Sequence, residues 1–531
     1  MAKKTNKNTN KSTKTRPKML GGYNTANAMV NYYLVLMFTV FPLYFSYKYS
    51  NIRHDKLNVF LLVSSIFALI EFVAAIALFI EKKHSGTLPD KRWYQNLSLS
   101  DYTFAAMVFL FTLSTIFSQY PGDSFTGNQG RNNGLMLYIL YFAVYIGCSR
   151  FFEFKDYVFV IFGAVCLIMY ILCVLNYFYI DPLGMLEGYD SKTAEDFTST
   201  IGNKNIMSAF CCITVPLFTV FWLNHKNTVL RYFYLVTAGV GFASLISSDS
   251  EGGFLGIIPL MLVLLLYYSR NVRKLGMFFV SAAVMMFFGK VLRLFSYLMG
   301  DKEKGFGALQ KFFIYSEKSY ILIGVCAVLA VAFIILSKKK ETLPRAVPFV
   351  IGGVYIAIAA VIISLFVHYT FVDTSSKLGS AMKFFRFDEK WGTHRGFMWI
   401  KSWEIFTSKG IKNALIGWGC DVYYSAFSPY FAELNDKFDN TATNCAHNEY
   451  LNYLINNGIL GLSAYLAFFG SVLVRAFRKA KDNYLALAFA APIVCYLFQS
   501  VVNIATPITT PYIFIFAGLC EAVCREKSIE N

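Results

Sequence analysis

Residues 157–180 read YVFVIFGAVCLIMYILCVLNYFYI, an apolar run that contains no charged side chain. A helix needs about 20 mainly apolar residues to cross the roughly 30 Å hydrocarbon layer of a bilayer. Backbone groups inside lipid must be satisfied within the segment, which an α-helix achieves and an isolated strand does not. This stretch therefore predicts a membrane-spanning helix.

Runs of the same kind recur from one end of the chain to the other. We expect spans near residues 27–47, 57–80, 102–118, 133–148, 157–180, 206–224, 230–247, 252–268, 275–298, 319–337, 346–367, 447–474, 484–503 and 508–524. The predicted fold class is all-α: a polytopic integral membrane protein with about fourteen transmembrane helices.

The composition of the 531-residue chain agrees with a lipid environment. Hydrophobic residues make up 56% of it and charged residues only 15%, whereas an average soluble domain carries about 25% charged residues. These values exclude disorder and coiled coil as the main class. The formal net charge of +17 leaves nucleic acid, anionic lipid, an acidic substrate or membrane orientation as explanations.

Short basic connections between the spans decide among these explanations. Clusters of Lys and Arg occur at residues 82–92, 270–274, 338–345 and 475–481. With the basic residues 1–20 placed inside, every cluster falls on the cytoplasmic side, as the positive-inside tendency requires. The charge excess then belongs to the cytoplasmic face, both termini are cytoplasmic, and nucleic acid is not an expected partner. High usage of Lys, Asn, Phe and Tyr suggests a low-GC bacterium, so we expect its cytoplasmic membrane.

The expected organisation has five parts. They are a disordered basic cytoplasmic tail (1–26), a membrane bundle of about eleven helices (27–367), an extracytoplasmic catalytic loop (368–446), three C-terminal membrane helices (447–524) and a cytoplasmic tail (525–531). The loop before the third-last helix is too long for a plain connector, which predicts helices of its own. Cys420 and Cys445 lie in it, either as a disulfide, which is permitted outside the membrane, or as two unpaired thiols.

The stretch that carries chemistry is CAHNEYLNYLINNGILGLSAYL, residues 445–466. On a continuous helix, Gly458 and Gly461 lie within about 40° of the azimuth of His447, and small residues there let another helix approach closely. His447 is expected in the first helical turn, where the helix dipole disfavours an imidazolium. A neutral His can act as a general base; the alternative is a His that caps a helix at the water interface.

These residues resemble a known family. His447-Asn448, nine residues, Gly458, two residues and Gly461 resemble the signature of bacterial O-antigen ligase and O-antigen polymerase-like membrane glycosyltransferases. Further resemblances are GNKN at 202–205 to the family's Gly-Asn-Pro-Asn, RNNGL at 131–135 to its Arg-x-x-Gly-Leu, and Arg395, Trp399 and LIGWG at 415–419 to its loop motifs. Together they cover roughly residues 120–470.

One segment departs from the family pattern. The family often has Ser-Arg-Gly at the outer end of a middle helix, with the Arg taken to bind the donor pyrophosphate. This chain has SDSEGG at residues 248–253, so the charge is inverted. Either Arg131, Arg395 or Lys383 supplies the anchor, or the donor site is arranged differently.

The resemblance implies that a polyprenyl-diphosphate-linked glycan is transferred to an acceptor hydroxyl outside the cytoplasmic membrane. His447 would be the catalytic base and Arg395, with Arg131, would clamp the diphosphate, since Arg matches phosphate oxygens with paired hydrogen bonds. The alternative for Arg395 is a loop ion pair with Asp388 or Glu404.

The remaining candidate substrate-binding residues are Asn203, Asn205 and Asn448. Asn448, with Asn452 and Asn456 on the same helix face, either binds sugar hydroxyls or bonds to a neighbouring helix. The implied partners are the glycan donor, a glycan, lipid or protein acceptor, and membrane lipids.

We expect no cofactor and no metal, because the outer loops lack metal-ligand spacing and base and clamp suffice for inverting transfer. Polymerisation of lipid-linked repeat units is the alternative within the same chemistry. A flippase or transporter is the alternative of another class. Glu71, in mid-span, is either functional, for instance in ion coupling, or a carboxyl held protonated or paired in the bundle.

Overall fold

The computed structural model describes residues 21–86, 97–300, 303–305, 307–374, 379, 382–408, 410–440 and 442–525. Besides helices, these ranges contain one two-stranded antiparallel sheet, formed by β1 (Phe197–Thr198) and β2 (Gly202–Asn203). The predicted all-α class is confirmed. Most of the two predicted tails (1–20 and 526–531), the connection 87–96 and the side chain of Lys383 lie outside the described residues.

A helix occurs in each range where a span was predicted. These helices are α1 (Gly21–Phe38) with α2 (Val40–Leu43), α3 (Ile52–His84), α4 (Leu99–Ile116), α6 (Leu135–Phe151), α7 (Asp156–Tyr177), α9 (Lys204–Asn224), α10 (Thr228–Ser247), α11 (Gly252–Tyr268), α12 (Val272–Met299), α14 (Glu317–Leu336), α15 (Val347–Val367), α20 (Glu449–Lys479), α21 (Tyr484–Gln499) and α22 (Thr510–Arg525). Within the described residues, 10 helices are long and apolar enough to cross a membrane, while α6, α11 and α21 are shorter apolar helices. The structure thus supports a multi-pass membrane protein, and the count of about fourteen crossings stays a prediction.

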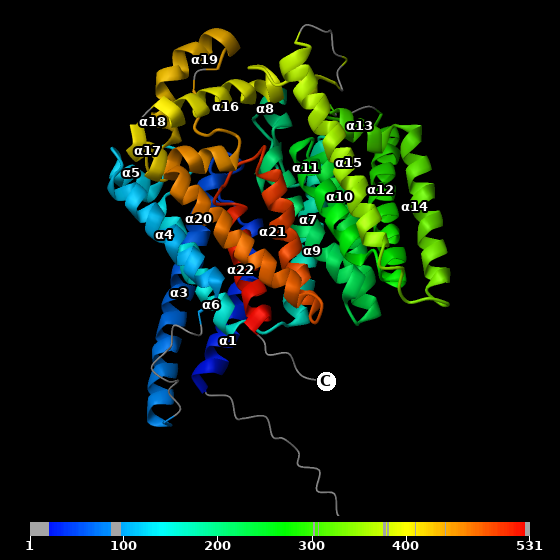
Figure 1. Cartoon of the computed structure of the whole chain (residues 1–531), viewed down its shortest axis with the longest axis horizontal. Helices are drawn as coiled ribbons and strands as arrows, with labels where there is room; N and C mark the ends of the chain where they lie inside the picture. The colour runs from blue at the N-terminus through cyan, green and yellow to red at the C-terminus, as the bar shows by residue number, and fades with distance from the viewer. Residues whose placement is uncertain are drawn as a thin grey trace, which may run out of the picture.

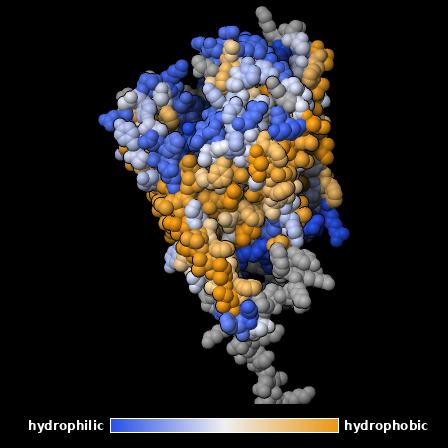
Figure 2. Space-filling model, turned by 90° about the vertical axis from the view of Figure 1, so that its left-hand side faces the viewer, coloured by the Kyte–Doolittle hydropathy of each residue, from blue (hydrophilic) through white to orange (hydrophobic). Residues whose placement is uncertain are grey.

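The molecular surface carries an apolar belt. Figure 2 shows it across the middle of one face, below a hydrophilic upper surface. On α3, Leu62, Ile66 and Leu69 are each more than half exposed. A soluble monomer rarely exposes contiguous apolar surface of this extent, so the belt is the part of the molecule that lipid covers.

The centre of the bundle is packed around α9. Nearly every side chain of α9 from Met207 to Leu223 is buried, against α10, α21 and α11. Glu71 on α3 is also buried, and neither of its carboxyl oxygens has a hydrogen-bond partner among the described residues. It therefore has no ion-pair partner there, which leaves the protonated and the functional interpretations of this residue.

The large loop, residues 368–446, does contain helices of its own, as predicted. They are η2 (His368–Val372), η3 (Met382–Phe385), α16 (Trp391–Ser408), α17 (Gly410–Ile416), α18 (Tyr423–Phe427), η4 (Ser428–Tyr430) and α19 (Phe431–Phe438). Phe397, Ile405, Phe427 and Leu434 form a separate small core inside it. In Figure 1, α16–α19 lie at the side of the bundle opposite to the start of α1 and the end of α22.

The large loop is fixed to α20 at a break in that helix. Gly458 has φ 67° and ψ −176°, so α20 is interrupted there, and the prediction of a continuous helix with a glycine stripe was wrong. The backbone N–H groups of Trp418 and Gly419 donate to the Ile455 and Asn456 carbonyls at 3.0 and 2.8 Å. A Cβ on Gly458 would lie 2.3 Å from the Leu415 carbonyl oxygen. The glycine therefore serves a close backbone contact with the loop rather than helix–helix packing.

Candidate functional site

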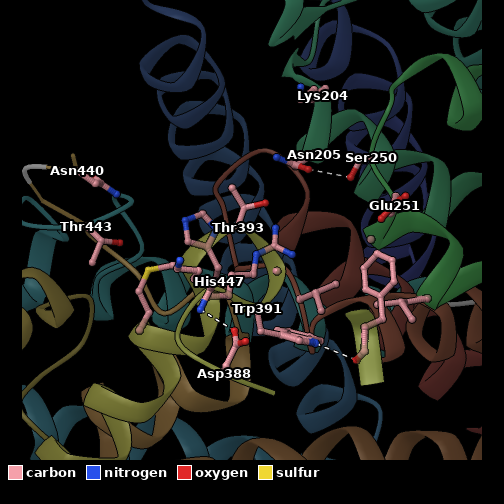
Figure 3. Close-up of a pocket in the computed structure, with 18 of the residues that line it drawn as sticks. Lys204, Asn205, Ser250, Glu251, Asp388, Trp391, Thr393, Asn440, Thr443 and His447 are labelled. Atoms are coloured by element: carbon pink, nitrogen blue, oxygen red, sulfur yellow. Dashed lines mark hydrogen bonds between the residues drawn. The ribbon is translucent and has the colours of Figure 1, made fainter. Parts of the chain in front are cut away.

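A cavity of about 1930 Å³ lies between the large loop and the adjacent ends of α9, α11 and α15. Of the residues predicted for the site, it is lined by His447, Arg395, Arg131 and Asn205. The first and the last of these four, Arg131 and His447, are 316 residues apart in the sequence. Figure 3 shows His447 and Asp388 on one side of the cavity and Lys204, Asn205, Ser250 and Glu251 across from them.

His447 is half-buried in the cavity wall and lies just before α20. It has φ 49°, and the next residue, Asn448, is the N-cap of the helix, with its side-chain oxygen accepting from the Leu451 N–H at 3.1 Å. The prediction that His447 occupies the first turn was therefore wrong, since the helix begins two residues later. The dipole of α20 therefore disfavours the imidazolium form of His447 less strongly, because the dipole effect falls off outside the terminal turn.

Two contacts from other elements hold the backbone next to His447. The Trp399 indole N–H of α16 donates to the Ala446 carbonyl at 3.0 Å, and the Ala446 N–H donates to Asn452 Oδ1 at 3.2 Å. Trp399 and Asn452, both singled out in the sequence, thus position the imidazole. Asn452 Oδ1 thus bonds to the large loop, a partner that neither interpretation of the asparagine stripe included.

A buried carboxyl anchors the first turn of α20. Glu449 accepts hydrogen bonds from the hydroxyls of Tyr465 and Tyr496, both at 2.8 Å, and from Ser500 Oγ at 3.1 Å. Its own N–H donates to the Ser500 carbonyl at 2.9 Å. Sequence reasoning missed this cluster, because it joins α20 to α21 through residues that no local motif connects.

Arg395 presents an unpaired cation to the cavity. Its guanidinium has no hydrogen bond or ion pair within the part of the chain that the structure describes. The expected alternatives do not apply, because Asp388 Oδ1 accepts from the Lys390 N–H at 2.9 Å and Glu404 pairs with Lys401 at 3.3 Å. Burial lowers the pKa of Arg395, which the nearby Cys445 partly offsets. A partly desolvated guanidinium without a partner favours binding of an anion.

Arg131, by contrast, is tied to the segment before His447. Its Nε donates to Asn444 Oδ1 at 2.9 Å and its Nη2 to Cys445 Sγ at 3.4 Å. Its backbone N–H donates to Asp421 Oδ2 at 2.8 Å. Burial raises the pKa of Asp421 to about 7, although the backbone donors of Asn133 and Arg131 oppose it. Arg131 therefore has a structural role as well as a place at the cavity.

The two loop cysteines are separate thiols, not a disulfide. Both are buried, and Cys445 lies two residues before His447. Burial raises the pKa of Cys445, but hydrogen bonds and electrostatic interactions with His447 and Arg131 outweigh it and lower the pKa to about 6. A thiol with a lowered pKa thus lies beside the two candidate site residues, which spacing alone did not reveal.

The candidate asparagines divide into two groups. Asn205 lines the cavity, and its Oδ1 accepts from Ser250 Oγ at 2.8 Å. Asn203 is the N-cap of α9, with its Oδ1 accepting from the Asn205 N–H at 2.9 Å. Asn203 and Asn448 do not line the cavity; their side chains begin helices. The substrate contacts predicted for these two residues have no support from the geometry.

The SDSEGG segment, residues 248–253, lies on the wall that faces His447. Asp249, Ser250 and Glu251 all line the cavity, and Asp249 Oδ1 accepts from the Gly307 N–H at 2.9 Å. Arg386, which sequence reasoning did not single out, also lines the cavity and donates to the Tyr369 and Asp373 carbonyls at 3.3 and 2.9 Å. Its bonds to carbonyls leave its positive charge without a carboxylate, so it adds to the anion-attracting character of the loop side.

Part of the cavity lining is apolar. Leu255 of α11 and Ile362 and Phe366 of α15 form this part, and α15 has no buried residue along its length. Polar and apolar side chains in the same lining suit an amphipathic molecule. Among the described residues, no group of three or more His, Cys, Asp and Glu could hold a metal ion, and the absence of a metal requirement stays a prediction.

Comparison with known proteins agrees with the motifs. Residues 307–466 match the sequence model of the O-antigen ligase family. The matched region contains the large loop, Arg395, His447 and Gly458, and it leaves Arg131, Asn203 and Asn205 outside. No curated protein matches the chain. The resemblance to O-antigen ligases is confirmed for this region, which supports a ligase-type enzyme of cell-surface glycan assembly.

Proposed function

We propose that this O-antigen ligase-like membrane protein transfers a glycan from a polyprenyl diphosphate to an acceptor hydroxyl on the outer side of a bacterial cytoplasmic membrane. The observation that carries the proposal is the unpaired Arg395 guanidinium in the same cavity as His447. A cation without an internal partner is available to the diphosphate. The same cavity offers the apolar side chains of α11 and α15 to the polyprenyl chain.

The transfer is a single displacement at the anomeric carbon. The acceptor oxygen attacks that carbon while His447 takes the hydroxyl proton, and the bond from the anomeric carbon to the diphosphate oxygen breaks with its electron pair remaining on the diphosphate. Arg395 stabilises the negative charge that develops on the leaving group. One displacement inverts the anomeric configuration, and neither a covalent intermediate nor a cofactor takes part.

The residues around the pair keep it in place. Trp399 and Asn452 fix the backbone of Ala446, and Arg131 holds Asn444 and Cys445. The segment that leads to the reacting imidazole is therefore held by contacts from three other parts of the chain. Such positioning lowers the entropic cost of bringing base and acceptor together.

The acceptor decides between a ligase and a polymerase. A lipid, wall polymer or protein hydroxyl makes the enzyme a ligase, and the sugar hydroxyl of another lipid-linked unit makes it a polymerase. The same base and clamp serve both, so polymerisation remains the second candidate function.

A deletion strain tests the class of function. A transferase predicts that the lipid-linked glycan accumulates facing outward, where an added glycosidase or lectin reaches it on intact cells. Complementation with wild type, or with the control Arg293→Gln, whose ion pair with Glu317 lies outside the cavity lining, clears the accumulated donor, whereas Arg395→Gln does not. Donor trapped on the cytoplasmic side would instead identify a flippase and overturn the proposal.

A further inference from the structure

The side of α15 that faces the bundle is not filled by protein. Tyr355 identifies that side, because its hydroxyl donates to the Leu262 carbonyl of α11 at 3.1 Å. Ile362 and Phe366 belong to the same side, since they follow Tyr355 at the spacing of one helix face and line the cavity that contains Arg395, which we call the main cavity. Ile358 and Ile362 are nevertheless 53% and 49% exposed. An inward-facing side that stays half exposed leaves open space beside it.

The facing side of α11 is open in the same way. Leu255, Ile258 and Leu262 follow one another at the spacing of one helix face, and each is more than a third exposed. The bond from Tyr355 to Leu262 places this stripe opposite α15, which lies beside α11 in Figure 1. Two apolar stripes thus face each other across a space that we call the lateral groove. It is lined by Leu255, Ile258 and Leu262 on α11 and by Ile358, Ile362 and Phe366 on α15.

The lateral groove is continuous with the main cavity, because Leu255, Ile362 and Phe366 line both. From Leu255 to Leu262 it is about 10 Å long, at a rise of about 1.5 Å per residue. Neither α11 nor α15 contains a charged residue, so this length lies at the depth of the lipid tails. The groove therefore connects the hydrocarbon layer with the cavity that holds the unpaired guanidinium.

A molecule that occupies both spaces needs an anionic head and a long apolar tail. Phosphatidylglycerol and a polyprenyl diphosphate both have this form. The diphosphate carries the larger negative charge, which suits a cavity lined by Arg395 and Arg386. These charges favour the polyprenyl diphosphate over the ordinary membrane lipid as the occupant.

We propose that the donor enters and the polyprenyl diphosphate product leaves through the lateral groove, with the isoprene units next to the diphosphate lying between α11 and α15. Lipid tails are as apolar as these side chains, so the groove supplies a path from the bilayer and little affinity. The assignment rests on the proposed function and adds to it the route of the lipid and the residues that line this route.

The test follows the polyprenyl chain directly and requires no transfer. A polyprenyl diphosphate with a diazirine in the isoprene unit next to the diphosphate is added to the full chain in lipid nanodiscs and irradiated, and the labelled residues are located by mass spectrometry. We expect labels at residues 255–262 of α11 and 358–366 of α15. Excess unlabelled polyprenyl diphosphate should remove these labels, and excess phosphatidylglycerol should leave them.

Two tryptophan variants block the groove from opposite sides. Ile258→Trp and Ile358→Trp should each remove the labels, and should lower the rate of glycan transfer at least about tenfold, which corresponds to about 1.4 kcal/mol and is within the range for an overpacked site. Ile356→Trp is the matched control on the same helix. Ile356 is 72% exposed and, two residues from Ile358, lies on a nearly opposite face of α15, so its replacement should change neither readout.

The labelling and transfer readouts separate the two proposals. Labels on other helices or none at all, equal removal by phosphatidylglycerol, or unchanged labels in both Ile258→Trp and Ile358→Trp would overturn the route. A loss in Ile356→Trp as large as in Ile358→Trp would do the same, because it would place the important contact on the outer face of α15. A wild type that is labelled in the groove but transfers no glycan would refute the proposed function and leave the route intact.

Discussion

Replacing Arg395 by Gln is expected to separate activity from stability. The guanidinium has no internal partner among the described residues, so the folded chain loses no hydrogen bond or ion pair. Because burial disfavours the charged guanidinium, its replacement should leave the melting temperature unchanged or raise it. The loss should therefore fall on substrate, where removal of one donor that stabilises developing negative charge lowers the rate about 100- to 1,000-fold.

The assay compares two readouts on the same purified protein. One is the initial rate of polyprenyl diphosphate release from a lipid-linked glycan, and the other is the melting temperature followed by tryptophan fluorescence. Arg395→Lys should retain part of the rate, because Lys keeps the charge but loses the paired hydrogen bonds of the guanidinium.

Two other arginines serve as controls for Arg395→Gln. Arg293 forms an exposed ion pair with Glu317 at 3.2 Å, so Arg293→Gln should leave both rate and melting temperature unchanged. Arg131→Gln removes bonds to Asn444 and Cys445 and should lower both. A rate for Arg395→Gln within about threefold of wild type, where a clamp predicts at least 100-fold, would refute the reasoning. So would a loss of rate that simply follows a fall in melting temperature.

Three further outcomes follow from the geometry. Gly458→Ala should destabilise the chain by at least about 1–3 kcal/mol, the cost of a backbone conformation that only glycine adopts readily. Gly470→Ala in the same helix should not destabilise it, because nothing lies within 4 Å of an added Cβ there. Equal melting temperatures of the two variants would contradict the contact of Gly458 with the loop. The Cys445 pKa is lowered to about 6 in the folded chain, so the stability that its thiolate contributes is complete above the unfolded pKa near 9 and declines as pH falls toward 6. The melting temperature of wild type should thus rise between pH 7.5 and 9 more steeply than that of Cys445→Ser, and parallel curves would remove the thiolate from the account. Glu449→Ala should cost about 1–3 kcal/mol for the Tyr465 hydroxyl that is left buried without an acceptor, while the Tyr496 hydroxyl keeps Thr510 Oγ1 at 3.3 Å. Glu449→Gln, which keeps an acceptor oxygen, should be milder, and a reversed order in thermal melts would contradict the network.

The membrane helices were predictable because lipid leaves the chain few alternatives. The run at 157–180 became α7, Asp156–Tyr177, with an error of a few residues at each end. Apolar length alone decides such segments. The number of crossings is harder to predict, since α6, α11 and α21 are short for spans.

The site was only partly predictable. The motifs named His447, Arg395, Arg131 and Asn205, and the structure brings all four to one cavity. The prediction assumed a continuous helix with about 100° per residue and therefore put Gly458 on the same face as His447. In the structure the helix is interrupted at Gly458, where the backbone of the large loop packs against it.

The environments of two titratable groups depend on contacts between distant segments. Asp421 accepts backbone bonds from a segment 290 residues earlier, and Arg131 from that same segment lowers the pKa of Cys445. No local pattern in the sequence carries information on such pairs.

The most direct test of the central claim uses wild type and His447→Gln reconstituted in vesicles with a polyprenyl-diphosphate glycan and an acceptor. We expect wild type to release one polyprenyl diphosphate for each glycan that appears on the acceptor with inverted anomeric configuration. His447→Gln should insert and melt as wild type does, yet release about 100-fold less or lower, as general-base removal predicts. Equal release by the two proteins, or movement of intact donor across the bilayer without cleavage, would contradict the account.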